Sequence, residues 1–216
     1  MTNSIKFKRI VAYFIDLLII SLLVTLISNI KALNPNRDKY NKTLKEYSAY
    51  NEELSESISN MESITANDLI TDEYVKYMYD LEYYGVSYRI IELAVVIIYF
   101  TVLPFYNKGR TFGKEFMKIT VVNEDGSKAY LWKHLVRALV IPIATNIILY
   151  SSFVTAFNIG LVFFMQPKSY FYANTIITFI STVLCYANIV FLLGSKKELA
   201  LHDKILKTKV VEYVKS

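Results

Sequence analysis

Hydrophobic residues in this chain are gathered into long continuous blocks instead of being spread at the spacing of a soluble domain. A helix needs about 20 mainly apolar residues to cross a hydrocarbon layer of about 30 Å. Four runs are long enough, and they cover residues 10–30, 86–106, 139–164 and 172–193. The pattern therefore predicts an all-α membrane protein with four transmembrane helices.

The segment between the first two runs is polar and has a different repeat. Apolar residues recur at alternating spacings of three and four within residues 40–61, and again within 70–88. This spacing places them on one seam of a helix, and Thr71 stands where an N-cap is expected. We predict an extracytoplasmic antiparallel helical hairpin over residues 36–85, whose second arm continues into the second span. Its seam serves either internal packing or the docking of a partner.

Two short β-branched stretches predict a small cytoplasmic β element. Residues 119–122 end at a turn-forming sequence, and residues 208–213 have a similar composition. Such runs are typical of strands, and the two stretches are suited to pair. The stretch from 129 to 140 is mixed instead, with Trp132 among basic residues, which is typical of a helix at the membrane interface.

The distribution of charge predicts the topology. The formal net charge is +5, but residues 31–85 carry six basic and eleven acidic side chains. The linker 107–133 and the tail from 195 each carry six basic and three acidic residues. Positive charge collects on the cytoplasmic side of membrane proteins, so we expect both termini to be cytoplasmic. The basic excess then reflects contact with the lipid bilayer, and we expect no nucleic-acid partner.

Several polar residues interrupt the apolar runs at matching depths. One set of three lies five to seven residues from the cytoplasmic ends of the predicted spans: Asp16, Asn146 and Asn188. A second set lies six residues from the outer ends: Glu92, Asn158 and Thr178. Ionisable residues inside membranes often mark ion or proton pathways, whereas Asn and Thr also join helices by hydrogen bonds. Both interpretations stay open.

Catalytic chemistry is not apparent in the sequence. The chain has two histidines and one cysteine, and neither a catalytic triad nor metal-ligand spacing is visible. The stretch 109–114 lacks the spacing of a phosphate-binding loop. We expect a protein that is not an enzyme and that uses no metal and no cofactor.

The motifs together resemble the RDD family of bacterial integral membrane proteins, which is named for one arginine and two aspartates. Arg9 and Asp16 match the first two signature residues, and Asp203 lies in a stretch that resembles the family's terminal pattern. Residues 109–114 resemble the linker after the second span, and Arg137 stands where the family often has an arginine.

This resemblance implies a membrane domain over residues 5–212 in the bacterial plasma membrane, and it favours transport, since some members are linked to sodium/proton exchange. It also raises the question of which arginine pairs with Asp203. Arg9, Arg110 and Arg137 are all suitable, and such a cluster is either a structural ion pair or an inner gate.

We hypothesise a cation- or proton-coupled transporter, or a subunit of one, in which Asp16 binds the small cation or proton. Asn146 and Asn188 are then neutral ligands, while Glu92 and Asn158 are candidates for an outer station. Because four spans are few for a transporter, we expect a homo-oligomer or a partner membrane protein. The alternative is a non-catalytic scaffold or accessory protein that recruits a partner through the hairpin.

Overall fold

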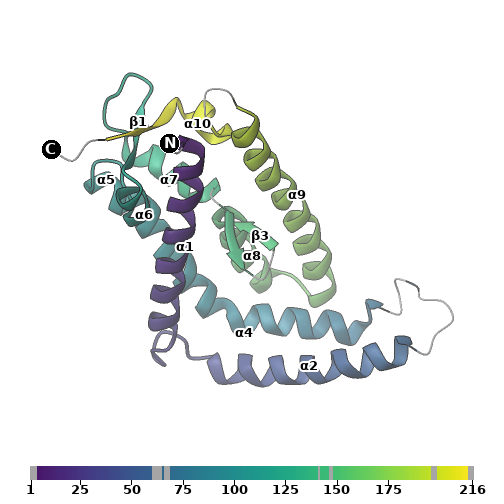
Figure 1. Cartoon of the computed structure of the whole chain (residues 1–216). Helices are drawn as coiled ribbons and strands as arrows, with labels where there is room; N and C mark the ends of the chain where they lie inside the picture. Colours follow the sequence, from purple (N-terminus) through teal and green to yellow (C-terminus); the bar gives the residue numbers. More distant parts are fainter. Residues whose placement is uncertain are drawn as a thin grey trace.

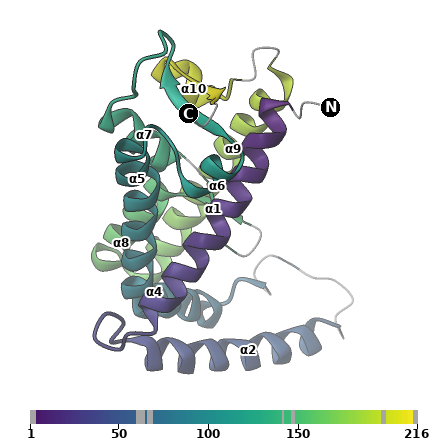
Figure 2. The ribbon, with the colours of Figure 1, turned by 60° about the vertical axis from the view of Figure 1, so that its left-hand side comes forward.

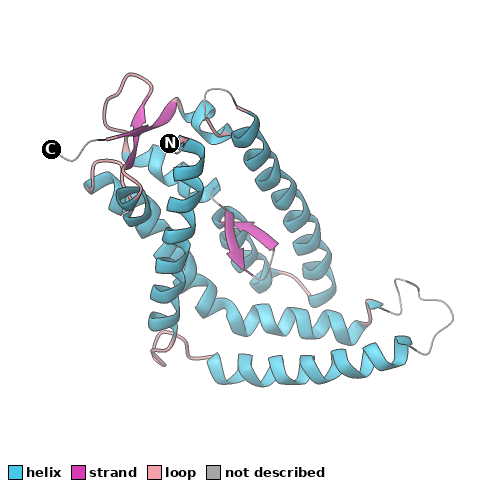
Figure 3. Cartoon of the chain, viewed as in Figure 1, coloured by secondary structure: helices cyan, strands magenta, loops and turns pink. Residues whose placement is uncertain are grey.

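The computed structural model of the chain describes residues 4–59, 65, 69–140, 142–145, 148–195 and 199–213 (Figure 1). In chain order the elements are α1 (Ile5–Ser28), α2 (Arg37–Ser59), α4 (Asp72–Ile97), the π-helix η1 (Ile98–Val102), α5 (Leu103–Tyr106), α6 (Phe112–Phe116), β1 (Ile119–Asn123), α7 (Leu131–Val140), β2 (Pro142–Thr145), β3 (Ile148–Ser151), α8 (Ser152–Phe164), α9 (Pro167–Gly194), α10 (Leu201–Leu206) and β4 (Thr208–Glu212). The fold is mostly helical, as predicted (Figure 3).

Three helices are long and apolar enough to cross a membrane, counted over the described residues. They are α1 with 24 residues, the continuous helix Asp72–Tyr106 with 35, and α9 with 28. Each contains most of one predicted span, so the spans 10–30, 86–106 and 172–193 are confirmed as helices of sufficient length. These helices indicate a membrane-embedded protein.

The two sides of α1 show how such a helix is used. Every fourth residue on one side is buried against the rest of the protein: Ala12, Asp16, Ile20 and Val24. The opposite side exposes a second stripe with the same spacing: Phe14 at 60%, Leu18 at 73%, Leu22 at 61% and Leu26 at 59%. A contiguous apolar stripe of this kind is rare on soluble monomers, and it supports a membrane-embedded helix.

The predicted span 139–164 is not a single helix in the structure, and the four-span arrangement is therefore not confirmed. Strands β2 and β3, over residues 142–145 and 148–151, pair in antiparallel register before α8 begins. Pro142 has no N–H to donate within a helix, and the residues that follow are rich in β-branched side chains. With 13 residues, α8 extends about 20 Å, less than the hydrocarbon thickness.

The π-helix in the second long helix is explained by a proline. Pro104 lies inside the continuous helix 72–106, two residues after the last residue of η1. A proline within a helix removes one hydrogen bond and collides with the carbonyl four residues earlier, here that of Phe100. The wider turn of η1 accommodates this collision, and it directs the Tyr99 and Phe100 side chains into the bundle, where both are buried.

The predicted helical hairpin is present. Helices α2 and α4 lie side by side and run antiparallel (Figure 1), and α4 continues directly into the second span. Thr71 caps α4 as predicted, because its hydroxyl accepts a hydrogen bond from the backbone N–H of Tyr74 at 3.0 Å. Tyrosine rings fill the seam, with Tyr47 6.1 Å from both Tyr74 and Tyr77. The seam is thus used for internal packing.

The predicted β element is also confirmed, since β1 pairs with β4 in antiparallel register from Ile119–Glu212 to Asn123–Thr208. Its inner face packs on the start of α1 through Ala12. Figure 2 shows this sheet close to both chain termini, at the end of the molecule opposite the α2–α4 hairpin. We call these two ends the terminal end and the hairpin end.

Candidate functional site

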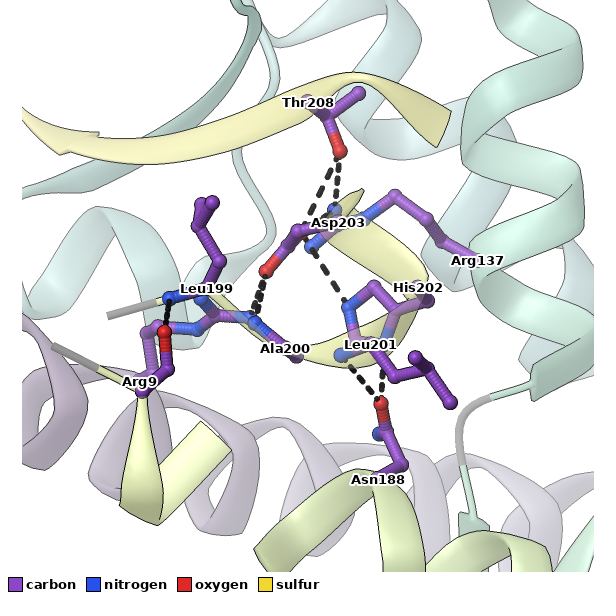
Figure 4. Close-up of polar contacts among 10 residues, drawn as sticks. Arg9, Arg137, Asn188, Leu199, Ala200, Leu201, His202, Asp203 and Thr208 are labelled. Atoms are coloured by element: carbon purple, nitrogen blue, oxygen red, sulfur yellow. Dashed lines mark hydrogen bonds and ion pairs between the residues drawn. The ribbon is translucent and has the colours of Figure 1, made fainter. Parts of the chain in front are cut away.

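At the terminal end, Asp203 is fully buried at the start of α10 and is held by two arginines from distant parts of the chain (Figure 4). Arg9 Nη2 of α1 donates to Asp203 Oδ2 at 2.6 Å, and Arg137 Nη1 of α7 forms a short ion pair with Oδ1. Arg137 also donates to the hydroxyl of Thr208, the first residue of β4, at 2.9 Å. We call Arg9, Arg137, Asp203 and Thr208 the Asp203 cluster.

The Asp203 carboxylate also organises its own helix. The backbone N–H of Ala200 donates to Oδ2 at 3.0 Å, which satisfies a donor that would otherwise be orphaned at the start of α10. Burial alone would raise the pKa of Asp203, but the charges of Arg137 and Arg9 hold that pKa well below its usual range. The group is therefore ionised at any physiological pH and joins α1, α7, α10 and β4.

Asn188 belongs to this end of the molecule through α10. Its Oδ1 accepts from the backbone N–H of Leu201 at 3.1 Å and lies 3.3 Å from His202 Nδ1. The other ring nitrogen, Nε2, lies 3.5 Å from Asp203 Oδ1, so each ring nitrogen of His202 faces an oxygen acceptor. Burial and the charge of Arg137 lower the pKa of His202 to about 3, so the imidazole is neutral.

Asp16 occupies a second buried cluster, and each of its partners comes from another segment. Tyr99 Oη donates to Oδ1 at 2.6 Å, Thr111 Oγ1 donates to Oδ2 at 2.6 Å, and the Gly113 N–H donates to Oδ1 at 2.7 Å. The last two donors lie at the first turn of α6, where a carboxylate is favoured by the helix dipole and by free N–H groups. We call Asp16, Tyr99, Thr111 and Gly113 the Asp16 cluster.

Gly113 lets α6 approach α1 at this point. A Cβ atom at Gly113 would lie 2.0 Å from the Ala12 carbonyl oxygen and 2.8 Å from Asp16 Oδ1, so a larger residue does not fit. The loop before β1 is therefore docked on the first span by a carboxylate inside the apolar run. Both carboxylate oxygens are occupied by donors, which makes Asp16 an anchor for this loop.

A polar pocket lies at the hairpin end, between α4, α8 and α9. Its lining residues are Glu82, Val86, Arg89, Thr155, Asn158, Ile159, Val162 and Asn174, and we call it the hairpin-side pocket. Arg89 pairs with Glu82 at 3.1 Å and with Glu92 at 3.6 Å, so two carboxylates share one guanidinium. Glu92 is 5% exposed.

Amide groups form the other wall of this pocket. Asn158 Nδ2 donates to Asn174 Oδ1 at 2.6 Å, and Thr178 Oγ1 donates to the same oxygen at 3.2 Å. The Asn158 Oδ1 atom is buried, and no donor among the described residues reaches it. A buried carbonyl oxygen without a donor costs about 1–3 kcal/mol unless something supplies one.

The structure thus regroups the polar residues predicted from depth. Asn188 is bonded to α10 and not to Asp16, because equal depth does not make two residues neighbours, and Asn146 lies outside the described residues. Of the three arginines considered for Asp203, Arg9 and Arg137 form the pair. Arg110 instead donates to Asn107 and stacks on the ring of Tyr213, with its guanidinium carbon 4.4 Å from the ring centre.

Several partners could not be chosen from the sequence. Tyr99, Thr111 and Thr208 are ordinary residue types in unremarkable positions, although a buried carboxylate signals that donors must lie somewhere. Among the described residues, no group of three or more His, Cys, Asp or Glu side chains is arranged to hold a metal.

A comparison with family models matches the RDD family over residues 6–207. The chain belongs to the RDD family. No curated protein and no solved structure matches it. In this RDD protein the three signature residues all lie at the terminal end, with Arg9 and Asp203 in one cluster and Asp16 in the other.

Proposed function

We propose that this RDD protein is a cation- or proton-coupled transporter of the plasma membrane, or a subunit of one, and that its ion site is the hairpin-side pocket. The observation that carries the proposal is the buried Asn158 Oδ1, which lines this pocket without a donor. A cation or a hydronium ion would satisfy that oxygen, because a cation needs only acceptors around it.

The charges around the pocket favour a cation. Two carboxylates, Glu82 in the pocket lining and Glu92 beside it, share the single guanidinium of Arg89, which gives this group one excess formal negative charge. The neighbouring Asn174 contributes an amide oxygen that already receives two donors. An excess of one negative charge beside neutral oxygens is the composition of a site for a small monovalent cation or a proton.

The clusters at the terminal end support a division of roles. Asp16 and Asp203 are each fully used by internal donors and arginines. Releasing either carboxylate for an ion would break contacts between several elements. We therefore assign these clusters to holding the cytoplasmic loop and tail against the bundle, and we move the ion site from Asp16 to the pocket beside Glu92.

The proposed topology keeps both termini in the cytoplasm and the α2–α4 hairpin outside. The described residues near the two chain ends lie at the same end of the molecule (Figure 1), which fits this arrangement. A bundle with three long helices encloses little volume, so we propose that the pathway is completed by a second copy or by a partner membrane protein.

The proposal is tested by cation-driven proton flux in proteoliposomes. Glu92→Gln keeps the size of the side chain and removes the excess charge, so we expect flux to fall at least about tenfold, equivalent to about 1.4 kcal/mol. Glu53→Gln makes the same chemical change on the exposed part of the hairpin and serves as the matched control. We expect it to leave flux unchanged.

Two results would refute this assignment. One is an absence of wild-type flux under sodium, potassium and proton gradients of either direction. The other is a Glu92→Gln protein that folds and transports like wild type.

A second candidate function, that of an accessory protein that recruits a partner, is favoured by a groove on the hairpin. The residues that line the groove include three carboxylates and two tyrosines of α2 and α4, namely Glu46, Glu53, Glu73, Tyr50 and Tyr77. A basic segment of an extracytoplasmic protein would match this lining. If such a protein copurifies with wild type, it should be lost from Glu53→Gln/Glu73→Gln and retained by Glu92→Gln.

A further inference from the structure

Helix α7 has two unlike faces at the terminal end. His134, Arg137 and Ala138 are buried against the bundle, at 2%, 5% and 0% exposure. The other face exposes Trp132 at 54% and Leu135 at 37%. A helix with one apolar exposed face and a polar opposite face is suited to lie at a membrane interface.

Two lysines flank the beginning of this helix, and each extends its ammonium group toward an aromatic ring. The distance from Nζ to the ring centre is 4.1 Å from Lys128 to Phe105 and 5.7 Å from Lys133 to Trp132. Lys128 lies in the β1–α7 connection and Lys133 in α7, which contacts α5. Lys114 lies further inward, where burial lowers its pKa to about 8 and the carboxylates of Asp16 and Asp203 act on its charge.

No carboxylate among the described residues lies within ion-pair distance of Lys128 or Lys133, although Lys133 donates to the Asn123 amide oxygen at 2.9 Å. The nearby Asp125 carboxylate already accepts from the N–H and the hydroxyl of Ser127. A ring face attracts an ammonium group but leaves most of its hydrogen-bonding capacity unused.

His134 lies on the buried face of α7, where the charge of Lys128 reaches it. Its Nε2 is buried and has no hydrogen-bond partner among the residues that the structure describes. Burial lowers the pKa of His134 to about 3, and the positive charges of Arg137, Lys114 and Lys128 contribute to this shift. His134 is therefore neutral at physiological pH, and positive side chains surround it.

We propose that this surface binds the headgroup of an anionic phospholipid. It consists of Lys128 and Lys133 together with the exposed residues Leu131, Trp132 and Leu135, and we call it the α7 surface. The phosphate lies among the ammonium groups, and an acyl chain lies along the apolar face of α7. Juxtamembrane lysines attract anionic lipids in this way, and an adjacent apolar face selects a lipid over a free anion.

The test uses Trp132, the one tryptophan in the sequence, as a reporter inside the surface. The full chain is reconstituted in phosphatidylcholine vesicles, and brominated phosphatidylglycerol or brominated phosphatidylcholine is titrated into matched samples. We expect brominated phosphatidylglycerol to reach half-maximal quenching at a several-fold lower mole fraction. Equal quenching by the two lipids would overturn the proposal without any variant.

Variants that neutralise one lysine each then test which residues give the preference for phosphatidylglycerol. Lys128→Gln and Lys133→Gln should each reduce the preference for phosphatidylglycerol about fivefold, the effect of one lysine near an anionic surface. Lys204→Gln removes an exposed charge from α10, at the same end of the molecule but outside the α7 surface, and should leave the preference unchanged. An equal loss in Lys204→Gln would show a general surface potential and would refute a defined site. Neither readout depends on transport.

Discussion

The terminal end and the hairpin end use the same residue types in opposite ways. At the terminal end, Asp16 receives three internal donors, and Asp203 receives two arginines and a backbone N–H. At the hairpin end, two glutamates share one arginine, and the Asn158 carbonyl oxygen has no donor in the described structure. Buried polar groups that are fully paired hold a structure together, whereas an unpaired one is open to a ligand.

The largest effect should come from removing the Asp203 carboxylate. Asp203→Ala leaves the two buried guanidinium groups of Arg9 and Arg137 without their shared carboxylate, so we expect a loss of about 3–5 kcal/mol in the free energy of unfolding. The measurement is denaturation of the purified protein in detergent micelles. Glu212→Gln removes the partly exposed pair with Lys8 and is the control, with an expected loss of less than about 1 kcal/mol. If both variants lose a similar free energy of unfolding, burial does not make the Asp203 ion pairs stronger than the partly exposed Lys8–Glu212 pair.

Lowering the pH should destabilise the terminal end before it destabilises the rest of the fold. The pKa values of His134 and His202 are lowered to about 3, from an ordinary value near 6.5. Below pH 6.5 the unfolded chain therefore binds protons that the folded protein does not, and stability falls as pH falls. Each histidine contributes about 1.4 kcal/mol per pH unit between roughly pH 6 and 3. His202→Gln should halve this slope in a pH series of unfolding measurements.

The same pH series of unfolding measurements also tests the role of Asp203. Its folded pKa lies below the unfolded value, so its contribution is present above about pH 4 and is lost at lower pH. Stability that stays constant from pH 7 to pH 4 would contradict the buried, neutral state of both histidines.

Gly113 is closely packed, whereas a side chain at Gly160 would have open space around it. Gly113→Ala forces a Cβ against the Ala12 carbonyl oxygen, and we expect it to cost about 1–3 kcal/mol and to loosen α6. At Gly160 in α8 nothing lies within 4 Å of a new Cβ. Gly160→Ala should therefore stabilise the protein by up to about 1 kcal/mol through helix propensity. Both variants are tested by thermal unfolding and by the rate of proteolysis in the loop before β1. If Gly113→Ala and Gly160→Ala give equal results, α6 is not docked at Gly113.

The smallest effect on stability should come from Asn158. Asn158→Ala removes one hydrogen bond to Asn174 but also removes the unpaired oxygen, so the net change should be less than about 1 kcal/mol. Cation binding or flux should nevertheless fall severalfold. If the variant is stable and binds cations like wild type, Asn158 has no role in ligand binding. The hairpin end would then be structural, like the terminal end.

Run length, hydropathy and residue type determined much of this architecture. Local patterns predict the three long helices, the hairpin of α2 and α4, and the strands β1 and β4, because each depends on neighbours in the sequence or on strand propensity. The third predicted span was not confirmed as one helix, because hydropathy does not distinguish a helix from strands, and Pro142 opens β2 there.

The partners of the buried carboxylates were decided by tertiary structure alone. Depth along the helices grouped Asp16 with Asn188, but depth leaves the direction around each helix axis undetermined. The fold brings residues 99, 111 and 113 to Asp16, and residues 9, 137 and 208 to Asp203. The sequence required donors for two carboxylates in apolar surroundings, and only the packing of distant segments determined which residues supply them.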